Sequence, residues 1–213
     1  MFVQFTDNRP KWFERSTAAL LLLFLAGCVS QDGAPDEPVE WVSEFAVPIV
    51  EPAPDVKEKN AERFDQALNA MEAQNLDQAE RLLMEITHDQ PELAGPWINL
   101  SHIHAARGET DAARTALEAA LAANPANCDA HTLLGVMARQ AGDFANAEKQ
   151  YRLCLMVRPD FKDAYLNLGI LYELYLGKLD LALQAYRSYQ GLLEEPDRKV
   201  EGWVMDLERR LGV

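Results

Sequence analysis

Between residues 60 and 195 the side chains that would form a packed face follow the period of an α-helix. They recur at i, i+3, i+4 and i+7, as in the series Trp97, Leu100, Ser101 and His104. This spacing places one stripe of side chains on each of a succession of short helices. The pattern therefore predicts an all-α domain built from repeated amphipathic segments.

The helical segments recur every 34 residues. Prolines and small residues keep this interval, at Pro91, Pro125 and Pro159 and at Ala79, Ala113 and Ala147. A proline ends the helix before it because it lacks the backbone donor and restricts the preceding residue, and an alanine lets two helices approach closely. One helix pair cannot bury its own face, so at least three pairs must stack.

This register resembles the tetratricopeptide repeat, in which each unit is a pair of antiparallel helices. The resemblance implies a right-handed α-solenoid of about four helix pairs, at residues 60–93, 94–127, 128–161 and 162–195. The first unit is degenerate, since Gln74 stands where the next two units have the turn glycines Gly108 and Gly142. The fourth unit carries an insertion within Tyr172–Gly177, which makes its turn geometry uncertain.

A further amphipathic helix follows Pro196. Its apolar positions have helical spacing, at Val200, Trp203, Val204, Leu207 and Leu211, and charged residues lie on the other side. We expect this helix to cap the open end of the stack, so that the repeat domain and its cap occupy residues 58–213.

The first 27 residues have the pattern of an export signal. A basic stretch ends at Arg15, a short apolar run covers residues 18–26, and Leu25-Ala26-Gly27-Cys28 follows. The run is too short to cross a bilayer, which takes about 20 apolar residues. The last four residues resemble the lipobox of bacterial lipoproteins, which implies cleavage before Cys28, acylation of its thiol and a lipid anchor. The alternative is an ordinary signal peptide or an uncleaved anchor with an unrelated cysteine.

Residues 28–57 are predicted to form a tether. They hold seven acidic residues, one basic residue and five of the 11 prolines, a composition that favours an extended chain. The stretch Trp41–Val50 is apolar, and it either docks on a groove or consists of a few solvated hydrophobic residues. In the lipoprotein family an Asp directly after the cysteine favours the inner membrane, so Val29 points to the outer membrane, with the protein facing the periplasm.

Charge and motifs exclude several functions. The net charge is -14 and the basic residues form no stripe, which argues against nucleic-acid binding. No nucleophile elbow, zinc-protease motif or phosphate-binding loop occurs, so we expect no enzyme, no metal, no cofactor and no small-molecule substrate. His102 and His104 lie two residues apart and would point to opposite sides of a helix. His104 and His131 occupy core positions of the repeat, and we interpret them as core residues.

The resemblance assigns binding to the concave face lined by the first helix of each unit. Carried over to this chain, the family's positions give Ile98, Asn99, His102, Thr132, Val136, Arg139, Leu166, Asn167 and Ile170. Asn99 and Asn167 share one repeat position, where an amide can donate to and accept from a peptide backbone, although Asn is also simply common there. Arg139 is the only clear cation, which argues against the family's carboxylate-clamp type of chaperone receptor.

Cys128 and Cys154 lie in the same unit, at ends that an antiparallel pair brings together. An oxidising periplasm permits a disulfide. A buried free thiol serves equally as the small residue that the repeat needs at position 154. The sequence favours two free thiols.

Together these features predict a lipid-anchored periplasmic scaffold that binds a peptide or protein partner. Lipoproteins of this build resemble those that assist assembly of type IV pilus secretins and those that accompany energised systems related to Tol and TonB. Others recruit peptidoglycan hydrolases, and an accessory role to an enzyme acting on envelope glycans is a further alternative. The sequence does not choose among them.

Overall fold

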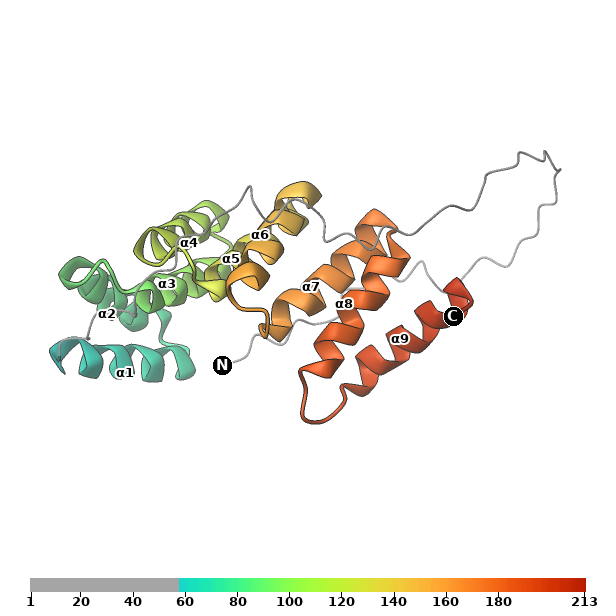
Figure 1. The fold of residues 1–213 in the computed structure, drawn as a ribbon. Coiled ribbons are helices and arrows are strands. Elements are labelled where there is room, and N and C mark those ends of the chain that lie inside the picture. The colour runs from blue at the N-terminus through green and yellow to red at the C-terminus, as the bar shows by residue number, and fades with distance from the viewer. Residues whose placement is uncertain (1–57) are drawn as a thin grey trace. The chain divides into compact units, whose positions relative to one another are not determined.

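The computed structural model describes residues 58–213, and every regular element in this range is a helix. Four pairs follow one another: α1 (Glu58–Glu72) with α2 (Leu76–Asp89), α3 (Ala94–Ala106) with α4 (Thr110–Ala123), α5 (Cys128–Gln140) with α6 (Phe144–Val157), and α7 (Lys162–Leu171) with α8 (Leu179–Gly191). Figure 1 shows these pairs in succession, with α9 (Arg198–Leu211) after α8. The all-α expectation and the four helix pairs are confirmed for these residues.

Each helix packs on its partner and on the next helix along the chain, and α5 also contacts α7. The small residues of the second helices lie at these contacts and are buried, at Ala79, Ala113, Ala147 and Ala182. Trp97 packs against the core of the first two pairs and also against the next cluster, formed by α4 and α5. Apolar packing is therefore continuous from one pair to the next, as a stacked repeat requires.

The turns within the first three pairs share one left-handed residue. Gly108 has φ +76° and Gly142 has φ +81°, a conformation that costs a glycine little. In the first pair Gln74 takes the same place with φ +59°, and it is the sole non-glycine with positive φ among the described residues. The degenerate first unit thus keeps the turn geometry and carries some strain.

The second helices of the first three pairs end in the same way. The residues after them, Gln90, Asn124 and Arg158, have φ of -144°, -145° and -129°. Each precedes one of the periodic prolines, which disfavours helical backbone at the residue before it. The 34-residue proline spacing therefore sets the length of every unit that it bounds.

The fourth pair differs where the sequence has its insertion. After α7 the chain continues as a π-helix, η3 (Tyr172–Leu176), and Gly177 then turns with φ +64°. A π-turn holds one more residue than an α-turn, so it absorbs the extra residue without displacing α8 from α7. It also brings Tyr175 to the surface, with 44% of the residue exposed.

Helix α9 covers α8, as expected for the last helix. Asp197 caps its start, because Oδ1 accepts from the backbone nitrogens of Lys199 at 2.9 Å and Val200 at 3.3 Å. Val200 and Leu207 are buried, and the Trp203 ring lies 5.3 Å from the ring of Tyr186, centroid to centroid. No described helix is both long enough and apolar enough to span a bilayer.

Candidate functional site

The nine residues assigned to the binding face come three each from α3, α5 and α7, and we call them the first-helix face. They are Ile98, Asn99, His102, Thr132, Val136, Arg139, Leu166, Asn167 and Ile170. Six of them are half-buried, whereas Thr132, Val136 and Asn167 are buried. A ligand would therefore first meet the half-buried six. Whether this face binds a partner stays a prediction.

The two repeat-related amides bond to their own helices. Asn99 Nδ2 donates to the carbonyl oxygen of Gly95 at 3.0 Å, and Asn167 Nδ2 donates to that of Asp163 at 2.8 Å. Each bond spans four residues and orients the amide along the helix. One donor of each amide is thus used internally. Asn99, which is half-buried, is the better placed of the two to bond a ligand.

Thr132 departs from the usual behaviour of a helical hydroxyl. Ser101 Oγ donates to the carbonyl oxygen of Ile98 at 2.6 Å, and Thr115 Oγ1 donates to that of Asp111 at 2.9 Å. Such bonds to the preceding turn are the common arrangement for these side chains. Thr132 Oγ1 is buried and has no hydrogen-bond partner. It is one of three such side-chain atoms in the described part of the chain.

The other two orphaned atoms are Arg139 Nε and the hydroxyl of Tyr151, which comes from α6. Tyr151 is fully buried, with its ring over Gly135 of α5, where an added Cβ would lie 2.5 Å from the ring. Burial raises the pKa of Tyr151, and the charge of Arg139 lies close enough to oppose that rise. These two polar groups therefore meet near the C-terminal end of α5.

Sequence reasoning missed the aromatic side chains around Arg139. Its guanidinium carbon lies 5.6 Å from the ring centroid of Tyr175, and Nη1 is 3.5 Å from the Tyr175 hydroxyl. The Tyr175 ring lies 5.1 Å from that of Phe144. The insertion in the fourth unit was the available signal, because a π-turn there brings Tyr175 next to the preceding unit.

The histidines do not gather into a metal site. His104 Nδ1 lies 2.7 Å from Glu109 Oε2, while burial lowers the pKa of His102 and nearby Asp129 opposes that shift. His131 is buried, which confirms its interpretation as a core residue, whereas His104 is half-buried and paired with Glu109. No group of three His, Cys, Asp or Glu side chains within residues 58–213 could hold a metal ion.

The expectation of two free thiols is wrong in the structure. Cys128 at the start of α5 and Cys154 near the end of α6 form a disulfide, with Cα atoms 4.6 Å apart. Both residues are buried. A small buried residue and a bridge are compatible at position 154, because the antiparallel pair places the two backbones within disulfide range.

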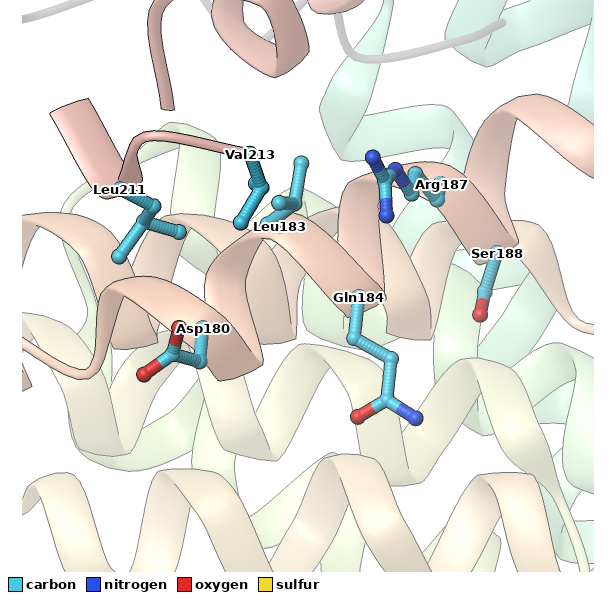
Figure 2. Close-up of a pocket in the computed structure, with 7 residues that line it drawn as sticks. All are labelled: Asp180, Leu183, Gln184, Arg187, Ser188, Leu211 and Val213. Carbon is cyan, nitrogen blue, oxygen red and sulfur yellow. The ribbon is translucent and has the colours of Figure 1, made fainter. Parts of the chain in front are cut away.

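A surface pocket lies between α8 and the C-terminal residues. It is lined by Asp180, Leu183, Gln184, Arg187, Ser188, Leu211 and Val213. Figure 2 shows Leu183, Leu211 and Val213 close together, with Arg187 and Ser188 further along α8. Arg187 already pairs with Glu208 at 2.7 Å, so its charge is not free for a ligand.

Several predicted features lie outside the described residues. These are the signal at residues 1–27, Cys28, the tether at residues 28–57 and its apolar stretch Trp41–Val50.

Comparison with known proteins agrees with the repeat architecture. The tetratricopeptide repeat family model matches residues 98–155, which run from α3 into α6. A search of curated proteins finds no match.

Solved structures share the fold across most of the described helices. A Pseudomonas aeruginosa pilF structure is 18% identical with a TM-score of 0.64, and the alignment covers 72% of this chain and 69% of that one. MamA from Desulfovibrio magneticus RS-1 is 17% identical with a TM-score of 0.60, covering 74% and 88%. A tetratricopeptide repeat protein from Parabacteroides merdae is 19% identical with a TM-score of 0.60, covering 73% and 61%. The fold is a tetratricopeptide-type α-solenoid, a class of fold that generally serves protein interaction.

Proposed function

We propose that this protein is a lipoprotein anchored through Cys28 to the outer membrane, and that its repeat domain binds a peptide or protein partner in the periplasm. The partner belongs to an envelope machine, of the pilus and secretin type or of the energised Tol and TonB type. The four-residue motif ending at Cys28 supports the anchor. The solenoid fold and its similarity to the Pseudomonas aeruginosa pilF structure support a scaffold role.

The observation that carries the binding role is that Arg139, on the first-helix face, lacks a paired carboxylate within residues 58–213. Other arginines at helix contacts pair with carboxylates, as Arg63 does with Asp89 at 2.7 Å and Arg107 with Glu80 at 2.6 Å. Arg139 is half-buried, and no carboxylate of the described residues pairs with it. A cation that is partly desolvated and unpaired suits a surface that a partner completes.

Affinity capture from crosslinked envelopes tests the binding role. The full chain should capture its partner, and the double variant Asn99→Ala with Arg139→Gln should lose most of that capture while keeping its helicity. A matched control, Arg81→Gln with Thr115→Ala, changes two residues on α2 and α4 and should capture normally. Undiminished capture by the face variant, together with loss on altering Trp41 and Phe45, would show that the tether is the recognition element.

Fractionation tests the anchor. Cys28→Ser should leave an unprocessed precursor or release the protein into the soluble fraction, because several acyl chains give stable anchoring that a bare chain lacks. A processed Cys28→Ser protein that still partitions into detergent would contradict the lipid anchor.

A further inference from the structure

The third and fourth helix pairs place a tyrosine against a glycine in the same way, but only one of the two hydroxyls has a partner. Tyr151 packs on Gly135, and Tyr186 packs on Gly169. The Tyr186 hydroxyl donates to Glu173 Oε2 at 3.0 Å, whereas the Tyr151 hydroxyl has no hydrogen-bond partner among residues 58–213. The packing is repeated, and the hydrogen bond is not.

The difference comes from one position of the repeat. Glu173 and Arg139 lie 34 residues apart, so they occupy equivalent positions in the fourth and third units. A carboxylate accepts hydrogen bonds, and a guanidinium can only donate them. Replacing the acid by Arg139 therefore leaves the Tyr151 hydroxyl without an acceptor and adds a second donor, Nε, that also has none.

The fourth unit shows the complete arrangement. The Glu173 carboxylate lies between two donors, with Tyr186 on Oε2 and Arg210 Nη1 at 3.4 Å from Oε1. Its side chain is 7% exposed, so the acid is buried between a tyrosine and an arginine. The third unit contains a tyrosine and an arginine side by side, but it has no carboxylate at the position equivalent to Glu173.

The Arg139 side chain is held in place by weak contacts. Within residues 58–213, Arg139 makes a long contact from Nη1 to the Tyr175 hydroxyl, at 3.5 Å, and lies over the Tyr175 ring. Tyr175 is itself 44% exposed. Because Tyr151 is fully buried, a ligand at the surface can reach both donors only when the Arg139 side chain rotates away from the Tyr175 ring.

We propose that Arg139 and Tyr151 bind one carboxylate of the partner. The Tyr151 hydroxyl and the Arg139 guanidinium donate to its oxygens, as Tyr186 and Arg210 do to Glu173. Arginine is suited to this role because Nε and an Nη form a fork that matches a carboxylate. This inference rests on the proposed function, since it names the ligand chemistry at one end of the first-helix face.

Small blocked amino acids test the site on the full chain in detergent. The probes are N-acetylglutamate α-amide, with a side-chain carboxylate, N-acetylalanine, with a terminal carboxylate, and N-acetylglutamine α-amide, with neither. The Arg139 Nε–H signal in ¹H–¹⁵N spectra should shift saturably with a carboxylate probe and stay in place with the glutamine probe. The tighter of the two acids identifies the source as a side chain or a chain terminus. The signals of ion-paired Arg63 and Arg107 should not move.

Variants separate a ligand role from a structural one. Tyr151→Phe should weaken probe binding about tenfold, or about 1.4 kcal/mol, while leaving the melting temperature unchanged or higher, because the buried hydroxyl has no hydrogen-bond partner among the described residues. The matched variant Tyr186→Phe, which removes a bonded hydroxyl, should lower the melting temperature. A loss of stability in Tyr151→Phe without a change in probe binding would overturn the inference.

The two proposals fail in different ways. If neither acid shifts the Arg139 signal at 100 mM, or if both bind equally to Arg139→Gln, the carboxylate site is wrong even where partner capture depends on the first-helix face. If the acids bind at Arg139 but capture is unaffected by the face variant, Arg139 and Tyr151 hold a carboxylate, but the partner is not bound on the first-helix face.

Discussion

The imidazole of His131 donates from Nε2 to the carbonyl oxygen of Pro125, at 2.9 Å. At the equivalent position 34 residues earlier, Trp97 Nε1 donates to the carbonyl oxygen of Pro91, at 3.0 Å. Two different rings thus tie the start of one helix pair to the proline that ends the pair before it. The two residues share a ring N–H that reaches the carbonyl oxygen of the preceding proline. His can therefore replace Trp at this position.

We predict that His131→Phe destabilises the domain by about 1–3 kcal/mol, because it fills the space but removes the ring's hydrogen bonds to the Pro125 carbonyl and to the Gln150 side chain. Urea denaturation followed by circular dichroism measures the change. Trp97→Phe, which deletes the equivalent bond at a half-buried site, should cost less. Equal stability of the wild type and His131→Phe would show that the bond contributes nothing net.

A second prediction concerns the close approach of α6 to α5. Gly135→Ser should destabilise the domain by about 1–3 kcal/mol, since a Cβ there would lie 2.5 Å from the buried Tyr151 ring. The preceding unit offers the compensating change, because Ser101 and Leu117 stand at the equivalent positions. The double variant Gly135→Ser with Tyr151→Leu should recover much of the loss. Thermal melts of the three proteins decide this, and additive losses would contradict the pairing.

The sequence predicts the features of the fold that repeat every 34 residues. Its prolines and turn glycines set the helix ends and the left-handed turns, and the helical spacing of apolar residues after Pro196 predicts α9. It does not predict the burial of Thr132 and Asn167, which depends on how closely neighbouring first helices pack. Comparing repeats position by position would have revealed the reversal from Glu173 to Arg139. The sequence alone could not show that this reversal leaves Tyr151 without an acceptor.

The disulfide gives a third prediction. Closing a loop between residues 26 apart in sequence stabilises the fold by about 3 kcal/mol in the chain-entropy model, so reductant should lower the urea midpoint. The preceding unit has Ala94 and Ala120 at the two equivalent positions, which makes Cys128→Ala with Cys154→Ala the matched variant. That variant should be less stable and insensitive to reductant. Thiol labelling of denatured, unreduced protein that modifies both cysteines would contradict the bridge.

The last prediction concerns alkaline pH and the buried hydroxyl of Tyr172. This hydroxyl donates to Glu148 Oε1 at 3.0 Å and accepts from Arg152 Nη2 at 2.9 Å. Burial is the main cause that raises the pKa of Tyr172 to about 12, and Arg152 opposes it. The group binds its proton more tightly in the folded chain than in the unfolded chain, where the pKa is about 10.

Stability from Tyr172 should therefore be fully present below about pH 10 and be lost as the pH rises towards 12. Urea midpoints measured from pH 9 to 11.5 should fall more steeply for the wild type than for Tyr172→Phe, which has no proton to lose. Burial likewise raises the pKa of Tyr189 to about 12, so the double variant Tyr172→Phe with Tyr189→Phe should be flatter still. Tyr175→Phe, which removes the hydroxyl of an exposed ring, serves as the control for loss of a tyrosine hydroxyl. Identical slopes for Tyr172→Phe and the wild type would mean that solvent reaches the hydroxyl, and that its bonds to Glu148 and Arg152 do not hold the turn of the fourth pair against α6.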